Sequence, residues 1–241
     1  MTTPVAIITG AGRRLGLETC KALLDRGYRV FALYRTDSDG IRALAQQGAV
    51  PLAADLADPE QVNGALAAVL EQTDQVHLLV NNASEFTADE PDAEQLALQA
   101  ARLYQVNSIA PMLLMSGLAD ALRKGCRNAG QPALVVNVTD IYVEKPNPRF
   151  AAYCASKAAL SNLTLSYARL LAPDVRVNGI MPGPIRFLPE HTPADQAQVL
   201  SETLLPWEGG FDSVVQQILS LLDNHFMTGA LIPVDGGRRL A

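Results

Sequence analysis

The sequence predicts an α/β fold: a doubly wound parallel sheet of about seven strands, in a single domain spanning residues 1–241. Three observations support this prediction. Short apolar runs rich in β-branched residues alternate with longer segments of helical period, as expected when helices connect parallel strands. Hydrophobic residues make up 49% of the chain, enough for one substantial core. No repeat, low-complexity tract or linker divides it.

The strands and helices are predicted from these runs in order. The predicted strands are 5–9, 29–34, 50–53, 76–80, 133–138, 175–180 and 231–234. Their unbroken apolarity indicates burial on both faces. The predicted helices lie near 15–27, 38–47, 59–72, 93–125, 151–172 and 211–223. Pro59 suits a first helical turn and Gly27 a helix end. Right-handed crossovers then place helices on both faces of the sheet.

Residues 182–210 interrupt this alternation. They hold five prolines, three glycines and Trp207. We therefore expect a loop with at most short helical pieces. Loops of that length often act as lids or binding elements, so this segment is predicted to be a substrate loop.

Composition excludes several classes of function. The net charge of −6 and pI of about 5.1 leave no basic footprint for nucleic acid. No apolar run approaches the ~20 residues of a membrane span, and the start of the sequence lacks the basic region of a signal peptide. The cysteines Cys20, Cys126 and Cys154 have no metal-like spacing, so we expect no metal site and a cytoplasmic location.

A glycine-rich turn follows the first predicted strand and opens the first predicted helix. There, backbone N–H groups can approach a pyrophosphate at the helix N-terminus, as in a Rossmann-type fold. An ordinary strand–helix turn is the alternative. The predicted cofactor contacts in this turn are Gly10, Arg13, Arg14, Leu15 and Gly16.

The second predicted strand ends in Tyr34, Arg35 and Thr36. A site that prefers NAD usually carries an acid here, which binds the ribose 2′-hydroxyl. Guanidinium groups instead suit a 2′-phosphate, so Arg35, with Arg13 nearby in sequence, favours NADPH. The alternative is that Arg35 is only a solvated surface charge. Further strand ends supply Asp55 and Leu56 for the adenine, and Asn82 and Ala83 for the adenosine and ribose.

Tyr153 and Lys157 are spaced i, i+4, which places both side chains on one helix face. An ammonium beside a phenol favours the phenolate, so Lys157 is expected to lower the tyrosine pKa. Such a tyrosine can exchange a proton near neutral pH. Asp140, thirteen residues before Tyr153, ends an apolar run and is expected to meet the same phenol.

With these residues in order, the chain resembles the short-chain dehydrogenase/reductase family over essentially its whole length. The resemblance rests on residues 9–16, Asp55, 81–83, Asn107, Tyr153 with Lys157, and 182–185. It implies that Tyr153 is the acid/base, that Lys157 binds the nicotinamide ribose and that Asn107 anchors a proton-relay water. It also implies cofactor contacts from Ser84, Pro182, Gly183 and Ile185.

Two departures from the general family are informative. Arg14 stands at the usual middle glycine of the phosphate turn, and Asp140 at the usual catalytic serine. Both replacements are similar to the pteridine reductase branch, which includes bacterial dihydromonapterin reductases. That branch also has an aromatic residue two positions after Ser84, here Phe86. The resemblance implies a homotetramer, with the 235–241 tail packing near a neighbouring subunit's site.

The chemistry agrees with this branch. A flat pterin can be held between the nicotinamide and an aromatic face, which Phe86 supplies, while Arg14 and Ser84 offer polar contacts. An ionised Asp140 would oppose the oxyanion of carbonyl reduction, whereas an Asp–Tyr pair can protonate the nitrogen of a C=N bond. The alternatives are that Phe86 only packs and that Asp140 only caps a strand end.

The predicted function is the NADPH-dependent reduction of 7,8-dihydromonapterin to the tetrahydro form, with dihydrofolate as a weaker substrate. The hydride is expected to go to C6 and the proton to N5. One alternative is a reductase of a small carbonyl or another cyclic imine. Another is a catalytically silent, nucleotide-sensing scaffold, against which the intact Tyr153, Lys157 and Asn107 argue.

Overall fold

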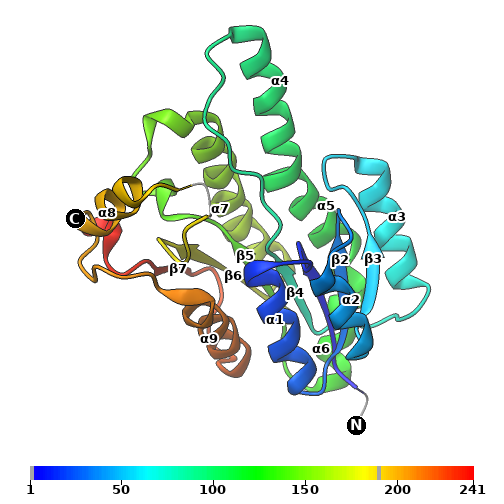
Figure 1. Cartoon of the computed structure of the whole chain (residues 1–241). Coiled ribbons are helices and arrows are strands. Elements are labelled where there is room, and N and C mark those ends of the chain that lie inside the picture. The colour runs from blue at the N-terminus through cyan, green and yellow to red at the C-terminus, as the bar shows by residue number, and fades with distance from the viewer. Residues whose placement is uncertain (1–2, 189–190) are drawn as a thin grey trace.

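Seven strands form one sheet in the order β3-β2-β1-β4-β5-β6-β7, and every neighbouring pair is parallel. The structure is a computed structural model that describes residues 3–188 and 191–241 (Figure 1). The strands are β1 (Val5–Thr9), β2 (Arg29–Tyr34), β3 (Val50–Ala53), β4 (Leu78–Asn81), β5 (Ala133–Val138), β6 (Val175–Pro182) and β7 (Leu231–Val234). This arrangement confirms the predicted α/β, Rossmann-type fold.

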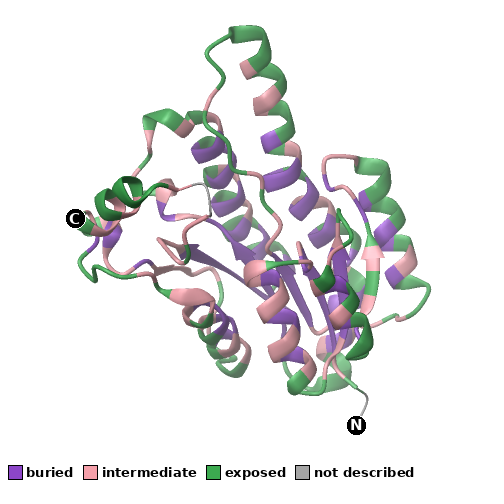
Figure 2. Cartoon of the chain, in the orientation of Figure 1, coloured by how far each residue is buried: buried purple, intermediate pink, exposed green. Residues whose placement is uncertain are grey.

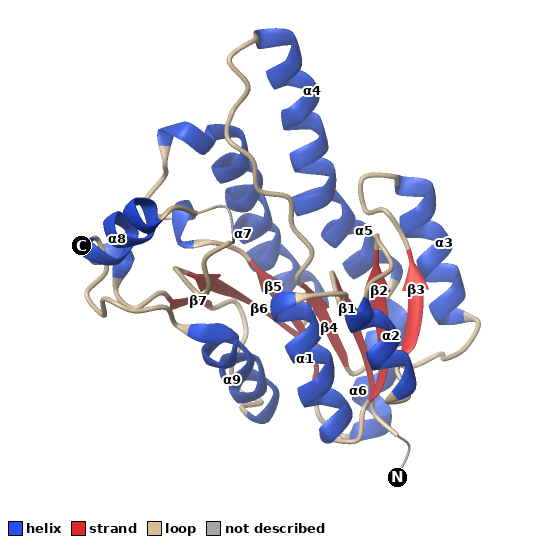
Figure 3. Ribbon diagram, viewed as in Figure 1, coloured by secondary structure: helices blue, strands red, loops and turns tan. Residues whose placement is uncertain are grey.

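Helices cover both faces of the sheet (Figure 3). They are α1 (Arg14–Asp25), α2 (Asp39–Gln46), α3 (Pro59–Leu70), α4 (Ala93–Tyr104), α5 (Ala110–Gly117), α6 (Ala119–Ala129), α7 (Ala151–Leu171), α8 (Pro193–Ser201) and α9 (Gly210–Asp223). Within residues 3–188 and 191–241, none of the helices combines the length and apolar character that crossing a bilayer requires.

Successive residues of a strand point to opposite faces, and the two cores follow from this alternation. Val5 and Ile7 pack with residues of α3, α5, α6 and α7, whereas Ala6 and Ile8 pack with residues of α1, α2 and α9. The strands β1, β2, β4, β5 and β6 are therefore buried on both sides, as their unbroken apolarity predicted (Figure 2). The same prediction is wrong for β3 and β7, which lie at the two edges of the sheet and are only partly covered.

The long helix predicted at 93–125 is wrong in detail, because the structure divides it into pieces. A π-helical turn, Gln105–Ile109, separates α4 from α5, and α6 begins after Leu118. In an α-helix, the N–H of residue 111 would bond to the carbonyl of Asn107. Pro111 has no N–H, so the regular ladder cannot continue there. The fourth strand also begins at Leu78 rather than at residue 76.

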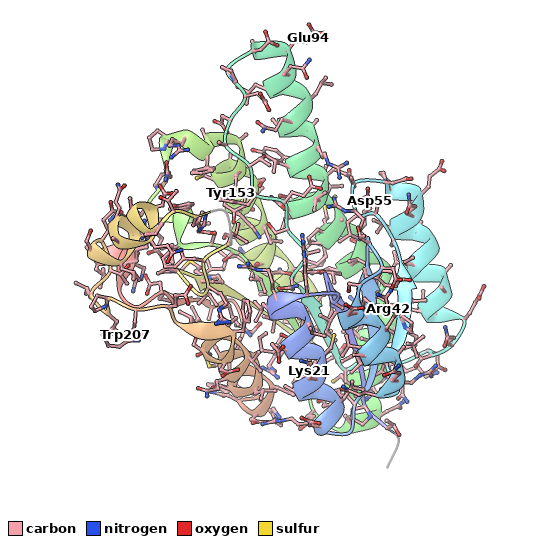
Figure 4. The ribbon with its side chains drawn as sticks, viewed as in Figure 1. Lys21, Arg42, Asp55, Glu94, Tyr153 and Trp207 are labelled. Carbon is pink, nitrogen blue, oxygen red and sulfur yellow. The ribbon has the colours of Figure 1, made fainter. Side chains whose placement is uncertain are left out.

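The carboxyl ends of the strands form the edge of the sheet where function is expected. Chain order reverses between β1 and β4, and ligands of open α/β sheets bind at such a switch point. In Figure 4, Asp55 and Tyr153 both lie at this end of the sheet. Helix α8 folds within the 182–210 segment, started by a capping box between Thr192 and Asp195.

Candidate active site

A cavity of about 1270 Å³ opens at the carboxyl ends of the strands. Most of the predicted site residues line it. They are Gly10, Arg13, Arg14, Leu15, Tyr34, Arg35, Thr36, Asp55, Leu56, Asn82, Ala83, Ser84, Phe86, Asp140, Tyr153, Pro182, Gly183 and Ile185. Gly16, Asn107 and Lys157 are not among the lining residues, although Asn107 accepts a hydrogen bond from Ser84, which is.

The glycine-rich turn is shaped by close backbone approach. Gly10 has a φ of +66°, and a Cβ there would lie 3.0 Å from both Ala83 Cα and the side-chain nitrogen Nδ2 of Asn82. A Cβ on Gly16 would lie 2.2 Å from the Gly10 carbonyl oxygen. Arg13, at the N-cap of α1, makes no side-chain cap bond to the first turn. The open turn at a helix N-terminus therefore fits a pyrophosphate.

Arg14 retains the backbone conformation of the glycine that it replaces. Its φ is +54°, in the left-handed region that side chains with a Cβ disfavour. The guanidinium donates to the Arg186 carbonyl oxygen at 2.9 Å and lies 5.5 Å from the ring centroid of Phe211. A bulky residue held in this conformation at the cavity wall indicates a functional demand for its side chain.

Arg35 lies at the end of β2 beside the cavity, with its side chain half exposed. It is paired: Nη1 donates to Glu85 Oε1 at 2.5 Å. Asp55 accepts a hydrogen bond from Ala57 N at 3.0 Å and so starts the turn toward α3. Its other oxygen lies 3.7 Å from Arg102. Two carboxylates and two arginines thus meet beyond the end of β2, and all of them except Arg102 line the cavity.

Asp140 and Tyr153 form the direct pair that their sequence context predicted. The Tyr153 hydroxyl donates to Asp140 Oδ2 at 2.7 Å. Asp140 Oδ1 accepts from Tyr142 N at 2.8 Å and caps the short 3-10 turn Ile141–Val143. Asp140 is therefore both a strand-end cap and a partner of the tyrosine. Tyr153 is only 4% exposed, so the pair is largely shielded from water.

Burial dominates the electrostatics of this pair. It raises the pKa of Asp140 above its ordinary value, against the hydrogen bonds from Tyr142 and Tyr153 and the charges of Lys157 and Arg238. Burial and the Asp140 carboxylate raise the pKa of Tyr153 well above its ordinary value. The sequence-based expectation that Lys157 lowers the tyrosine pKa is wrong for this arrangement, because desolvation and a neighbouring anion both favour the neutral phenol.

Lys157 lies one turn beyond Tyr153 on α7 and is buried. Its Nζ donates to the Val138 carbonyl oxygen at 2.8 Å and lies 5.9 Å from the Tyr153 ring centroid. Burial lowers the pKa of Lys157 to about 8. The lysine therefore joins α7 to the end of β5, the strand that leads into Asp140.

The Asn107 side chain is fully used within the protein. Its amide nitrogen donates to the Glu85 carbonyl oxygen and to Ser156 Oγ, each at 3.0 Å. Its oxygen accepts from Ser84 Oγ at 3.1 Å and from Glu85 N at 2.9 Å. A carboxamide has two donors and two acceptor sites, so all four are taken. The side chain positions the 84–86 segment rather than offering a free group to water.

Phe86 belongs to an aromatic cluster beside the hydrogen-bonded side chains of Asp140 and Tyr153. Its ring stacks on Phe150, with centroids 4.4 Å apart, and meets the Tyr153 ring edge-on at 4.7 Å. Phe86 nevertheless remains 42% exposed and lines the cavity. Packing and an available aromatic surface therefore coexist in this residue.

Several residues in this cavity were not predicted from sequence. They are Glu85, Tyr142, Phe187, His191, Phe211 and Arg238. Phe187 and His191 belong to the 182–210 segment, so the interruption of the strand–helix pattern was the available signal. Arg238 is nearly buried in the C-terminal tail, where it donates to Val199 O at 2.7 Å and to Glu202 at 3.0 Å. Such contacts leave no trace in local sequence.

The sequence profile of the short chain dehydrogenases matches residues 4–196. The chain belongs to the short-chain dehydrogenase family. Two dihydromonapterin reductases, from Klebsiella pneumoniae and Escherichia coli K12, are each 36% identical to this member. The alignments cover 97% and 99% of this chain, and 96% and 98% of the two relatives.

A solved structure extends the similarity to three dimensions. FolM alternative dihydrofolate reductase 1 from Brucella canis, complexed with NADP, matches this short-chain dehydrogenase with a TM-score of 0.88 at 32% identity. The superposition covers 99% of this chain and 94% of that one. The similarity thus extends beyond residue 196, where the profile match ends, through the rest of the 182–210 segment and the C-terminal tail.

Proposed function

We propose that this protein is an NADPH-dependent reductase of dihydropteridines, with 7,8-dihydromonapterin as its main substrate and dihydrofolate as a weaker one. The observation that carries the proposal is the buried hydrogen bond between Tyr153 and Asp140 at the cavity wall. The two relatives named dihydromonapterin reductase and the FolM structure with NADP support it.

NADPH, when bound, supplies the hydride. The turn around Gly10 and the N-terminus of α1 would hold its pyrophosphate, since only glycine fits the close approach to Ala83. Arg35, at the end of β2, would bind the 2′-phosphate. Asp55 and Leu56 line the same end of the cavity and would contact the adenine. Lys157 would bind the nicotinamide ribose, and the main chain of residues 182–185 would contact the nicotinamide end of the cofactor.

The pterin would lie beside Phe86, whose exposed surface supplies an aromatic contact close to Tyr153. Arg14 and Ser84 line the cavity and would meet the polar edge of the bicycle. Residues of the 182–210 segment, including Phe187 and His191, would cover the substrate and exclude water.

The Asp140–Tyr153 pair would deliver the proton. Raised pKa values keep protons on this pair to higher pH than free side chains would allow. A substrate nitrogen that gains electron density during reduction accepts such a proton. A carbonyl oxygen would instead develop negative charge close to the Asp140 carboxyl group, and the ionised form of that group would oppose it, which disfavours carbonyl substrates. This charge argument ranks pteridine reduction above reduction of a small carbonyl.

A substrate comparison tests the proposal. We expect kcat/KM with NADPH to be highest for dihydromonapterin, lower for dihydrobiopterin and dihydrofolate, and near background for a diketone panel. Turnover of diketones without turnover of dihydropterins would instead establish a carbonyl reductase. Cofactor binding without any turnover would indicate a silent scaffold.

A cofactor comparison is independent of the substrate. Charge-assisted hydrogen bonds contribute ~1.5–3 kcal/mol each, so we expect Arg35→Asp to cost roughly 10- to 100-fold in NADPH preference. Equal use of NADH and NADPH by the unmutated protein would contradict the assignment. We also propose that the protein is a homotetramer located in the cytoplasm. Light scattering of the purified protein measures the mass of the assembly and so tests the tetramer.

A further inference from the structure

Glu85 is the centre of an ion-pair cluster at the adenosine end of the cavity. Its carboxylate accepts from Arg35 Nη1 at 2.5 Å, and from Arg102 Nε and Nη2 at 2.8 and 2.7 Å. Arg35 directly follows β2, whereas Arg102 lies on α4. The Glu85 side chain is 20% exposed and the two arginines about half exposed. The carboxylate is therefore clamped between two cations, of which only Arg35 lines the cavity.

The main chain keeps Glu85 in this place. Its N–H and C=O are both bonded to the side chain of Asn107, which itself donates to Ser156 on α7. The backbone of Glu85 is thus anchored to the helix that carries Tyr153. The anchored backbone therefore holds the carboxylate between Arg35 and Arg102, where it contacts both.

When NADPH binds, the Glu85 carboxylate and the 2′-phosphate would both interact with the Arg35 guanidinium. The guanidinium of Arg35 that would bind a 2′-phosphate already serves the Glu85 carboxylate, and a phosphate at Arg35 would lie close to that negative charge. NADH brings only a hydroxyl to the same position. The energetic effect of Glu85 should therefore differ between the two cofactors.

We propose that Glu85 is a cofactor-specificity residue that competes with the 2′-phosphate of NADPH for Arg35, and that Arg102 holds Glu85 when the phosphate binds. The proposal rests on NADPH as the cofactor. Glu85 limits the affinity for NADPH and NADP⁺ alike, while Arg102 limits that penalty. The bidentate geometry of Arg102 on Glu85 suits this holding role.

The test measures Kd for NADP⁺ and NAD⁺ by titration calorimetry in the unmutated protein, Glu85→Gln, Arg102→Gln and the double variant. We expect Glu85→Gln to tighten NADP⁺ binding by about three- to tenfold and to change NAD⁺ binding less than about twofold, the scale of partly exposed charges. Arg102→Gln should weaken NADP⁺ binding, because Glu85 then depends on Arg35 alone. The double variant should bind NADP⁺ as Glu85→Gln does.

A matched control and a minimal probe sharpen the test. Glu90→Gln removes the same charge from an exposed position in the same loop, and should leave both Kd values unchanged. Adenosine 2′-monophosphate should gain affinity in Glu85→Gln, whereas adenosine 5′-monophosphate should not. Ratios of Kd for the two cofactors cancel effects common to both, including the loss of the Arg102 contact with Asp55.

The outcomes separate this inference from the cofactor assignment. If the unmutated protein binds NADP⁺ no tighter than NAD⁺, the proposed cofactor is wrong. If it prefers NADP⁺ but Glu85→Gln leaves that preference unchanged, or weakens it, Glu85 does not compete for Arg35. Thermal melts of the five proteins, with equal unfolding temperatures expected for Glu85→Gln and Glu90→Gln, exclude loss of folding as the cause.

Discussion

The Tyr153 hydroxyl and the Asp140 carboxylate are joined by a 2.7 Å hydrogen bond, although Tyr153 lies in the first turn of α7 and Asp140 lies in the loop after β5. The second carboxylate oxygen is fixed by Tyr142 N, so the bond to the phenol has a set direction. A buried acid and a buried phenol that share hydrogen-bonded contact titrate as a pair.

Asp140→Ser should abolish most dihydropterin reduction, because a hydroxyl keeps the hydrogen bond but removes the carboxyl that supports proton transfer. The unmutated enzyme should slow as pH rises, since deprotonation of Asp140, whose pKa is raised above the ordinary carboxyl value of ~4, removes one of the two protons of the pair. This limb should vanish in Asp140→Ser. The measurement is kcat against pH for both proteins on dihydromonapterin and on a diketone. Identical profiles would reduce Asp140 to a strand-end cap.

Tyr153→Phe should lower kcat by ~10²–10⁴, the usual range for loss of a general acid–base group. The Kd for NADP⁺ should change little, because the ring and its contact with Phe86 remain. Tyr142→Phe is the matched control, since Tyr142 also lines the cavity and also loses a hydroxyl. The Tyr142 hydroxyl bonds to Asn147 and not to Asp140. Near-normal turnover by Tyr153→Phe would overturn the assigned mechanism.

Phe86→Ala should raise KM for dihydropterin by the equivalent of ~1–2 kcal/mol, through lost stacking and apolar contact. Phe86→Trp should be tolerated, because it keeps an aromatic face. Steady-state kinetics with saturating NADPH measure the effect, and cofactor titration supplies the comparison. Parallel losses of substrate and cofactor affinity in Phe86→Ala would mark the ring as packing for Phe150 and Tyr153.

Arg14→Gly should leave the fold intact and weaken the binding of the dihydropterin substrate. Glycine adopts the φ of +54° without strain but gains freedom in the unfolded chain, so the free energy of unfolding should change by less than ~1 kcal/mol. Arg14→Ala keeps the Cβ and its strain, and should be the less stable variant. Both should raise KM for dihydropterin. Denaturant unfolding with kinetics checks this, and normal KM in either variant would remove Arg14 from the substrate site.

Asp140→Asn should gain stability over the unmutated protein as pH rises. A folded-state pKa above the unfolded value means that the folded protein binds this proton more tightly, so its stability falls as pH rises between those two values. Asparagine carries no such proton. The difference in free energy of unfolding should therefore grow as pH rises from about 4, up to the raised pKa of Asp140 in the folded protein. Parallel stability curves would show that Asp140 is not destabilised by burial.

Sequence alone determined the fold class and most of the cavity wall. Parallel strands are buried on both faces, so their apolar runs stand out, and their carboxyl ends all meet at one edge. The residues after each run, such as Gly10, Arg35, Asp55 and Asn82, consequently converge without further information. Tyr153 and Lys157 were equally readable, because an i, i+4 spacing fixes their common helix face.

Tertiary structure decided what local pattern cannot encode. Helical periodicity continues through Gln105–Ile109, so only Pro111 hinted at the π-helical turn there. The pairing of Arg35 with Glu85 joins residues fifty positions apart, and the contacts of Arg238 with α8 span nearly forty. Most of all, the direction of the Tyr153 pKa shift reversed the expectation from Lys157. Sequence spacing predicts which charged groups share a helix face. Burial, which depends on the whole fold, decides whether the charged or the neutral form of a group such as the Tyr153 phenol is favoured.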